Sequence, residues 1–401
     1  MCEVSIDVIS CCVFCTRVKR NVSKIASKPG SASVNTLRFS KLIEELPATV
    51  PFVGPEHLER ELGIAFHSRI GANENVFGPS DSVLREIDRS KELSWQYGDP
   101  ELLELRSELS DFLGVDIDEV VVGEGIDALL GYTCRLFVDP GDTVVTSDGA
   151  YPTFNFHATG HGARIQSIPY KNDRADLESL AKSAEVIDAK LIYLANPDNP
   201  TGTSWNSKNI NQFVSSISTR CVVLLDEAYG EFAADDILPI IDTSLTNLVR
   251  LRTFSKAYGL AGLRVGYAIG HRDLIRQFEK IRNHFGVGKL SQVAALAALK
   301  DQRHVNNILG LVAKSKEKIY RIAADNGLAV IQSDTNFVSI DCGHGGDYAR
   351  RVLESLIRMG VFVRMPAVAP LDRCIRVTCG TDSDLDFFAQ SLPVALAEAR
   401  K

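Results

Sequence analysis

Lys256 stands among hydroxyl side chains, where its amine could carry out covalent chemistry. Thr253 and Ser255 come just before it, and Arg264 follows after a glycine-interleaved segment. Hydroxyl groups and a guanidinium are suited to binding a phosphate, which arginine can contact bidentately. An amine held beside a bound phosphate is what a Schiff base with pyridoxal phosphate requires. On this stretch alone, a solvated lysine and a surface arginine after a strand remain an alternative.

Two upstream segments place further polar side chains where predicted strands end. The apolar run 221–225 leads directly to Asp226, and Tyr229 follows three residues later. A second apolar run, 190–195, leads into a turn rich in Asn, Pro and Gly that contains Asn199. Buried parallel strands deliver such side chains to the edge formed by their carboxyl ends. There a carboxylate could pair with a protonated pyridine nitrogen, and a phenol could reach the ring oxygen.

With these residues the sequence resembles the fold-type I pyridoxal-phosphate aminotransferases of class I and II, and among them most closely the histidinol-phosphate aminotransferase family. The resemblance covers about residues 68–401. It implies a pyridoxal 5′-phosphate enzyme that transfers an amino group between a small-molecule amino donor and a 2-oxo acid. The matching segments occur in the family's order: Asn73-Glu74-Asn75 with Gly78-Pro79-Ser80, Gly125-Ile126-Asp127, Tyr151-Pro152-Thr153-Phe154, NPDNPTG from Asn196, DEAYGEF from Asp226, TFSKAYGLAGLRVGY from Thr253 and IRVTCGT from Ile375.

The resemblance implies a role for each candidate site residue. Lys256 would hold the cofactor and then move a proton as general acid–base, Asp226 would keep the ring nitrogen protonated, and Tyr229 would bond the ring oxygen. Asn199 would share that last contact. The cofactor phosphate would be bound by Tyr97, Gly125, Ile126, Asp127, Thr253, Ser255 and Arg264. The ring would be covered by Phe154. The substrate side would contain Arg376, Asn73 and Phe77.

Several of these roles compete with plainer interpretations. A glycine-rich turn between strand and helix, as at Gly125, is weak evidence for a phosphate site by itself. Asp127 could be an acid favoured at a helix N-terminus by the helix dipole. An aromatic residue after a strand, such as Phe154, is more often part of the core, and a strand arginine such as Arg376 could face solvent.

The alternation of strand and helix patterns predicts an α/β fold. The resemblance makes it a fold-type I transferase, with a mainly parallel seven-stranded sheet in a large domain and a small α+β domain. The predicted boundaries give a flexible N-terminal extension over 1–40 and a segment over 41–75 that packs with the small domain. The large, cofactor-binding domain then covers 76–285 and the small domain 286–401.

Composition narrows the function classes. The chain has 401 residues, 45% hydrophobic and 24% charged, with a formal net charge of -7, which argues against nucleic-acid binding. No apolar run approaches the roughly 18 residues of a membrane span. Most of the nine cysteines lie singly in predicted core elements, which favours a reducing, cytoplasmic location. Cys12 and Cys15 have CxxC spacing without a second ligand pair, so no metal site is predicted.

One departure concerns the substrate. Histidinol-phosphate enzymes usually carry a tyrosine where this chain has Phe77, and in the family that hydroxyl helps to hold the substrate phosphate. Losing a hydrogen bond to a charged group costs about 1.5–3 kcal/mol, so its absence would shift substrate preference without abolishing binding. The amino donor therefore stays undetermined, and transamination of another, for example aromatic, amino acid remains open.

Two further functional hypotheses use the same scaffold. A pyridoxal-phosphate decarboxylase or lyase of the threonine-phosphate decarboxylase type would need the same Lys256 and Arg376. A regulator that uses the fold as an effector sensor would need a DNA-binding domain, and no helix-turn-helix pattern precedes residue 41. The resemblance also implies a homodimer with shared active sites, in which the hydroxyl of Tyr97 reaches the cofactor phosphate of the neighbouring subunit.

Overall fold

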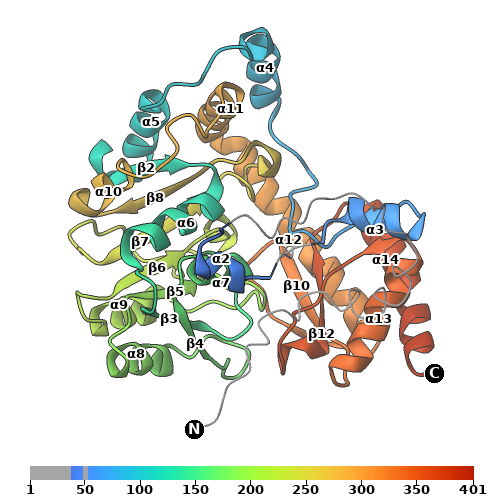
Figure 1. The fold of residues 1–401 in the computed structure, drawn as a ribbon. Helices are drawn as coiled ribbons and strands as arrows, with labels where there is room; N and C mark the ends of the chain where they lie inside the picture. Colours follow the sequence, from blue (N-terminus) through green and yellow to red (C-terminus); the bar gives the residue numbers. More distant parts are fainter. Residues whose placement is uncertain (1–37, 48–52) are drawn as a thin grey trace, which may run out of the picture.

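A computed structural model describes residues 38–47 and 53–401 of the chain. The large domain is built around a sheet of seven strands. Beside it lies a small domain that contains the C-terminus (Figure 1). Most of the predicted N-terminal extension lies outside the described residues. Cys12 and Cys15 lie outside them as well. Within the described parts of the chain, no helix is both long and apolar enough to cross a bilayer.

The central sheet of the large domain is mostly parallel, which confirms the predicted fold class. Its strand order is β2-β8-β7-β6-β5-β3-β4, and β8 runs antiparallel to both of its neighbours. The strands are β2 (Val120–Gly123), β3 (Thr143–Ser147), β4 (Arg164–Ile168), β5 (Leu191–Ala195), β6 (Val222–Asp226), β7 (Leu248–Thr253) and β8 (Gly266–Gly270).

Helices cover both faces of this sheet, so its central strands are apolar on both sides. Alternate residues of β5 therefore enter different cores: Tyr193 packs on one face and Ile192 on the other. Leu224 shares the face of Tyr193, and so does Asp226, two residues further along β6. The covering helices are α6 (Gly125–Phe137), α7 (Pro152–Gly160) and α10 (Arg272–Phe278) on that face, and α8 (Leu177–Val186) and α9 (Ser207–Ser216) on the other.

The small domain packs helices against an antiparallel sheet with the order β12-β10-β9. Its core contains fully buried aliphatic and aromatic side chains such as Val338, Val352 and Phe388. Its elements are α12 (Gln302–Asp325), β9 (Ala329–Ile331), β10 (Phe337–Asp341), α13 (Gly346–Arg358), β11 (Val361–Phe362), β12 (Cys374–Thr378) and α14 (Asp382–Ala399). Short 3-10 turns occur at Lys91–Leu93, Ile117–Glu119, Gly230–Phe232, Ala261–Leu263 and Leu371–Arg373.

The segment before the large domain contacts the small one. It contains α2 (Lys41–Glu45), α3 (Pro55–Leu62) and β1 (Ser68–Arg69), which pairs in parallel with β11. Leu58 of α3 packs against Phe362, and Ile70 belongs to the core of the small domain. This arrangement brings the residues after β1 to the junction between the two domains.

The large domain extends beyond the predicted boundary at 285–286. Helix α11 (Lys289–Lys300) packs against α4 (Asp81–Ser90) and α5 (Leu103–Leu113), and the three share one hydrophobic core. The domains meet along α12, because Val305 still belongs to that core whereas Ile308 packs in the small domain. An Ala- and Leu-rich helix such as α11 does not reveal from its sequence which of the two cores it joins.

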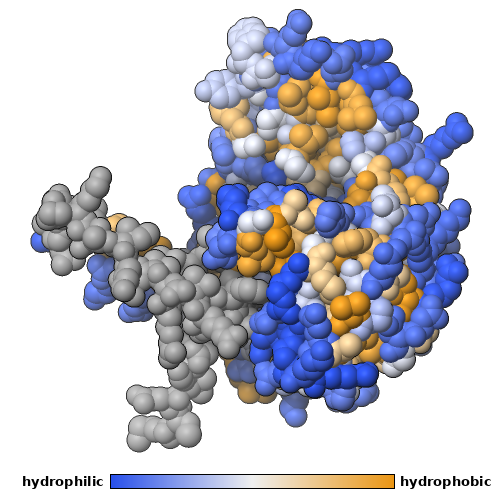
Figure 2. All heavy atoms as spheres, turned by 90° about the vertical axis from the view of Figure 1, so that its right-hand side faces the viewer, coloured by the Kyte–Doolittle hydropathy of each residue, from blue (hydrophilic) through white to orange (hydrophobic). Residues whose placement is uncertain are grey.

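The surface seen from the side of the small domain is mainly hydrophilic, with separate hydrophobic patches (Figure 2).

Cysteines contribute to the interior. Five free cysteines of the described chain are buried, and burial raises the pKa of the Cys379 thiol to about 12. Such thiols act as small core side chains.

Candidate active site

A cavity of about 300 Å³ lies where the strand ends of the large sheet face the small domain. Most of the candidate residues from the sequence line it, and they come from segments far apart in the chain. The structure brings together Asn73, Ile126, Asp127, Asn199, Asp226, Tyr229, Thr253, Ser255, Lys256, Arg264 and Arg376. Gly125, Phe154, Phe77 and Tyr97 do not line this cavity.

Lys256 follows β7 and directs its amine into the cavity. Its Nζ donates a hydrogen bond to the carbonyl oxygen of Asn73 at 3.0 Å and lies 5.5 Å from the centre of the Tyr229 ring. Burial, together with the positive charge of Arg376, lowers the pKa of the amine to about 8. A substantial fraction of Lys256 is thus neutral near physiological pH, as a nucleophilic amine requires.

Asp226 ends β6 as a fully enclosed carboxylate. Its Oδ2 accepts a hydrogen bond from the Tyr193 hydroxyl at 2.7 Å, and its Oδ1 accepts one from the backbone N–H of Ala228 at 3.0 Å. Burial raises the pKa of Asp226 to about 6, although these two hydrogen bonds oppose the shift. Both donors are neutral, so the carboxylate is suited to pairing with a cationic group in the cavity.

Tyr229 presents its hydroxyl between two amide side chains. Asn73 donates from Nδ2 to the Tyr229 hydroxyl oxygen at 2.9 Å, and Asn199 does so at 3.5 Å. Burial raises the pKa of Tyr229 to about 12, so the phenol keeps its proton and can act as a donor. The three side chains form a polar wall opposite the Lys256 amine.

A guanidinium, two hydroxyls and the start of a helix converge at the other end of the cavity. Arg264 donates to the Ser255 hydroxyl at 3.4 Å and pairs with Asp127 at 3.5 Å, while Thr253 and Ser255 are 2.9 Å apart at their hydroxyls. Helix α6 begins at Gly125, whose φ of 82° suits glycine. A Cβ at Gly125 would lie 2.5 Å from the Arg264 guanidinium, so a larger residue there would displace this arginine. Free N–H groups at a helix start bind anions, so this end fits a phosphate.

Three tyrosines line the cavity, among them Tyr151, whereas Phe154, which the sequence had suggested, does not. Phe154 is 0% exposed and stacks on Tyr193 with ring centres 4.9 Å apart. It lies in the first turn of α7, which directs it into the core beneath α6. Tyr151 precedes that helix, lines the cavity and donates its hydroxyl to Asp127 at 2.9 Å. The structure thus moves the candidate ring-covering residue three positions upstream.

Two arginines from the small domain enter the cavity, and only one was predicted. Arg376 on β12 donates to the side-chain oxygen of Asn199 at 2.5 Å. Arg364 bridges to Arg376 through the backbone and lines the cavity beside it. The Arg364 guanidinium also donates to the carbonyl oxygen of Val53 at 3.0 Å. The signal for Arg364 was weak, since it appears as one arginine after a short apolar run.

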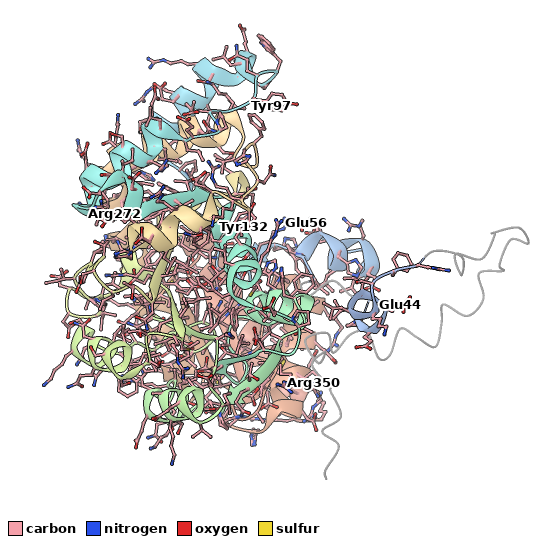
Figure 3. All side chains as sticks on the ribbon, turned by 60° about the vertical axis from the view of Figure 1, so that its left-hand side comes forward. Glu44, Glu56, Tyr97, Tyr132, Arg272 and Arg350 are labelled. Atoms are coloured by element: carbon pink, nitrogen blue, oxygen red, sulfur yellow. The ribbon has the colours of Figure 1, made fainter. Side chains whose placement is uncertain are left out.

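Phe77 and Tyr97 lie apart from this cavity. Phe77 is half-buried and packs against the core of the small domain. Tyr97 is 79% exposed, its ring lies 4.8 Å from that of Phe285, and Figure 3 shows it at the outer edge of the molecule. Neither residue lines the cavity that contains the Lys256 amine of the same chain.

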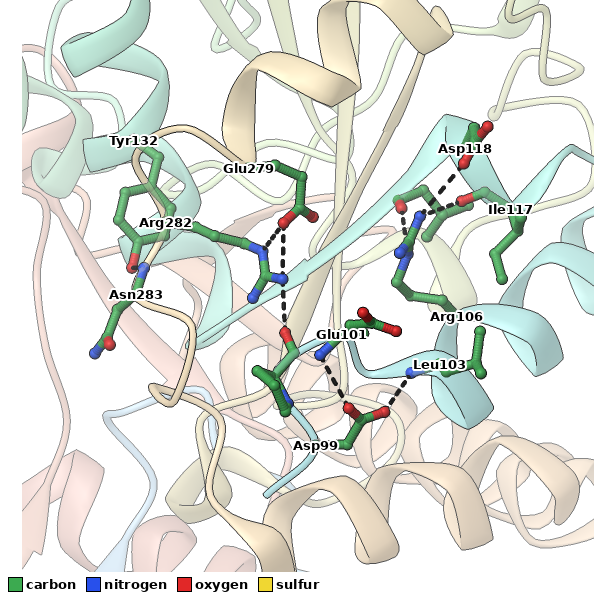
Figure 4. A network of polar contacts seen from close by, with 12 residues as sticks. Asp99, Glu101, Leu103, Arg106, Ile117, Asp118, Tyr132, Glu279, Arg282 and Asn283 are labelled. Atoms are coloured by element: carbon green, nitrogen blue, oxygen red, sulfur yellow. Dashed lines mark hydrogen bonds and ion pairs between the residues drawn. The ribbon is translucent and has the colours of Figure 1, made fainter. Parts of the chain in front are cut away.

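The turn that carries Tyr97 is held by a network of polar contacts (Figure 4). Asp99 accepts a hydrogen bond from the backbone N–H of Leu103 at 2.9 Å and so satisfies a donor at the start of α5. From the opposite side, Arg282 donates to the carbonyl oxygen of Pro100 at 2.6 Å. These contacts fix the backbone of the turn and leave Tyr97 facing outward.

Comparison with known proteins agrees with this geometry. The sequence model of the family "aminotransferase class I and II" matches residues 69–392. The chain belongs to the class I and II aminotransferases. Among curated relatives of this aminotransferase, the histidinol-phosphate aminotransferase of Macrococcus caseolyticus is 35% identical over 346 residues, covering 85% of this chain and 95% of the relative. That of Moorella thermoacetica is 32% identical over 352 residues, covering 87% and 90%.

Solved structures give the same family. The histidinol-phosphate aminotransferase of Sinorhizobium meliloti, determined in complex with pyridoxal-5′-phosphate, superposes with a TM-score of 0.88 at 46% identity and covers 90% of this chain and 98% of its own. An aspartate aminotransferase of Thermus thermophilus shares the fold with a TM-score of 0.76 at 17% identity. This aminotransferase therefore has the fold-type I architecture predicted from its sequence.

Proposed function

We propose that this aminotransferase uses pyridoxal 5′-phosphate to exchange an amino group between histidinol phosphate, or a closely related amino compound, and 2-oxoglutarate. One observation carries the proposal: the buried amine of Lys256, whose pKa is lowered to about 8, shares one cavity with the Asp226 carboxylate and with the anion-binding end formed by Arg264 and Ser255. That combination provides an amine for an aldehyde, an acid for a ring nitrogen and donors for a phosphate.

The residues of the cavity fit this cofactor. Arg264, Ser255, Thr253 and the first N–H groups of α6 would hold its phosphate, and Asp226 would hold its ring nitrogen. Tyr151 would cover one face of the ring. When bound, pyridoxal phosphate supplies an aldehyde that exchanges amino groups and a ring that withdraws electrons from the substrate Cα.

The protein's own groups position the substrate and move its proton. Lys256 takes the proton from Cα, because burial keeps part of its amine neutral and no second base is needed beside it. Tyr229, protonated and held by Asn73 and Asn199, would donate a hydrogen bond to the ring oxygen of the bound cofactor. The hydrogen bonds from Asn73 and Asn199 hold the Tyr229 hydroxyl in one orientation, so little reorganisation is required.

Arg364 and Arg376 suit an anionic substrate. Two neighbouring guanidiniums line the cavity from the small domain, and guanidinium groups bind phosphates and carboxylates bidentately. A substrate phosphate and the carboxylates of glutamate or 2-oxoglutarate could use the same pair in successive half-reactions. The names of the M. caseolyticus and S. meliloti relatives support histidinol phosphate as the phosphorylated partner.

We also propose a homodimer in the cytoplasm. The exposed ring of Tyr97, on a rigid turn at the edge of the large domain, would complete the phosphate site of a second subunit. Buried, unpaired cysteines support a reducing compartment.

Cofactor reconstitution tests the proposal. The purified chain with pyridoxal phosphate should acquire visible absorbance, and borohydride should attach the cofactor to Lys256. Histidinol phosphate should discharge that absorbance, and 2-oxoglutarate should restore it. In Lys256→Ala, both the label and the turnover should be lost, with kcat reduced by about 10³-fold or more. A Lys256→Ala protein that transaminates at the wild-type rate would refute the proposal.

A further inference from the structure

Tyr193 was not among the candidate residues, yet it contacts the carboxylate that defines the ring-nitrogen end of the cavity. It lies on β5, directly opposite Leu224 of β6, and Asp226 is the diagonal neighbour on the same face of the sheet. Diagonal neighbours on adjacent strands lie about 7–8 Å apart, which a tyrosine can span. The 2.7 Å hydrogen bond from the Tyr193 hydroxyl to Asp226 Oδ2 is thus set by strand register.

The Tyr193 ring is itself held in place. It is 1% exposed, and Phe154 stacks on it with an interplanar angle of 12°. Phe154 is fully buried beneath α6, so it cannot reach the cavity, although its ring supports a residue that does. Rigid packing behind a hydrogen-bonding group holds its geometry during a reaction.

The two hydrogen bonds to Asp226 complement each other. The Tyr193 hydroxyl occupies Oδ2 and the Ala228 N–H occupies Oδ1, so one donor at each oxygen fixes the plane of the carboxylate. Burial raises the pKa of Tyr193 well above its usual value, so the phenol remains a donor. Each bond to the charged form also makes the carboxylate easier to keep ionised in a buried site.

We propose that Tyr193, braced by Phe154, is a positioning residue that holds Asp226 ionised and aimed at the ring nitrogen of the bound cofactor. This inference rests on the proposed cofactor and adds a residue to its site. Tyr193 acts through Asp226 and without contact to the reacting atoms, so its loss should weaken catalysis more than substrate binding.

The test compares Tyr193→Phe with Tyr348→Phe, a matched loss of a buried hydroxyl. Tyr348 donates to the carbonyl oxygen of Leu396 at 3.1 Å within the small domain, away from the cavity. Removing a hydrogen bond to a charged group corresponds to about a 10- to 100-fold change in an equilibrium or rate constant. Tyr193→Phe should lower cofactor affinity and kcat for histidinol phosphate by at least about tenfold, shift the absorbance maximum of the bound cofactor and leave KM within about twofold.

Tyr348→Phe should lower the melting temperature similarly while keeping wild-type absorbance, cofactor affinity and kcat. If Tyr193→Phe matches Tyr348→Phe in those three measurements, the inference is wrong. If Tyr193→Phe does not fold, Phe154→Leu provides the test instead. This variant keeps the Tyr193 hydroxyl but removes the ring that packs against Tyr193. It should lower kcat several-fold at unchanged KM. A Phe154→Leu protein with wild-type kcat and absorbance would then overturn it. A wild-type protein that binds no cofactor would instead refute the proposed function.

Discussion

Asp226 and Lys256 lie at or within three residues of the ends of neighbouring strands of the large sheet, whereas Arg364 and Arg376 reach the same cavity from the small domain. The first pair belongs to the cofactor half of the cavity, defined by Asp226, Lys256, Tyr229 and Arg264. The second pair forms the substrate half. The cofactor half is thus built on one rigid sheet, while the substrate half depends on how two domains meet. We expect substitutions in the first half to affect chemistry and those in the second to affect substrate choice.

After the loss of Lys256 itself, the largest effect should come from Asp226→Asn. The change removes the carboxylate that would pair with the ring nitrogen, and breaking a buried ion pair costs about 3–5 kcal/mol, or roughly 10²- to 10⁴-fold in kcat. Steady-state kinetics with histidinol phosphate would measure it. Glu231→Gln, which neutralises a buried acid outside the cavity, should stay within a few-fold of wild type. Equal decreases in kcat in both variants would contradict the expectation that substitutions in the cofactor half affect chemistry most.

The same substitution should stabilise the cofactor-free protein at neutral pH. Asp226 has a pKa of about 6 when folded against 3.8 for the ordinary group, so the folded state retains its proton longer. Stability from this group is therefore complete below about pH 4, falls as pH rises to 6, and stays lowered above it. Urea unfolding of the apoproteins at pH 7 should favour Asp226→Asn by on the order of 1 kcal/mol, and this advantage should vanish near pH 4.

Next should come the substrate arginines. Arg376→Ala removes a charge-assisted contact, so kcat/KM for histidinol phosphate should fall by about 10- to 100-fold, mainly through KM. Arg364→Ala should act in the same direction. Arg358→Ala, on the exposed surface of α13, is the control and should behave as wild type. With histidinol, which lacks the phosphate, the arginine variants should show a smaller decrease in kcat/KM. An equal decrease with both substrates would argue against phosphate recognition by these arginines.

A smaller effect should come from Tyr97→Phe, about tenfold in cofactor affinity, because one hydrogen bond to a phosphate disappears. Subunit mixing tests whether the contact crosses the interface. In a mixed dimer of Tyr97→Phe and Lys256→Ala, one site would regain both Lys256 and the partner's hydroxyl. Wild-type cofactor affinity at half the sites should result. Failure to recover that affinity in a verified mixed dimer would contradict the shared site.

The smallest effect should be that of Phe77→Tyr. The resemblance to histidinol-phosphate enzymes suggested that a hydroxyl at residue 77 would strengthen substrate binding by about 1.5–3 kcal/mol. Because Phe77 packs against the small-domain core and does not line the cavity, we expect kcat/KM for histidinol phosphate to change less than about twofold. A tenfold gain would place residue 77 in the substrate half after all.

Residues of the cofactor half were also easier to predict from the sequence than those of the substrate half. Asp226, Asn199 and Lys256 could be found because each comes shortly after an apolar strand pattern, and parallel strands bring their carboxyl ends together. The α/β fold followed from the same alternation. Tyr193 was missed because a tyrosine inside an apolar run looks like core, and its partner is identified only once the register of β5 and β6 is known.

The errors have physical causes as well. Choosing Phe154 over Tyr151 depended on where α7 begins, because that point decides which aromatic ring enters the core. Arg364 had no distinctive neighbours, and only its pairing with Arg376 in the folded chain shows that it shares the cavity. The core that α11 joins could not be deduced from its sequence, because the helix is apolar enough to suit either one.

The turn containing Asn199 is fastened to the small domain at several points. Besides the contact with Arg376, the carbonyl oxygen of Pro200 accepts the Ser339 hydroxyl at 2.8 Å, and that of Gly202 accepts the Asp334 N–H at 2.8 Å. A rotation of the small domain would consequently pull this turn with it and displace the amide that steadies Tyr229. A substrate anion that moves Arg376 would in this way also shift Asn199, whose amide contacts the Tyr229 hydroxyl.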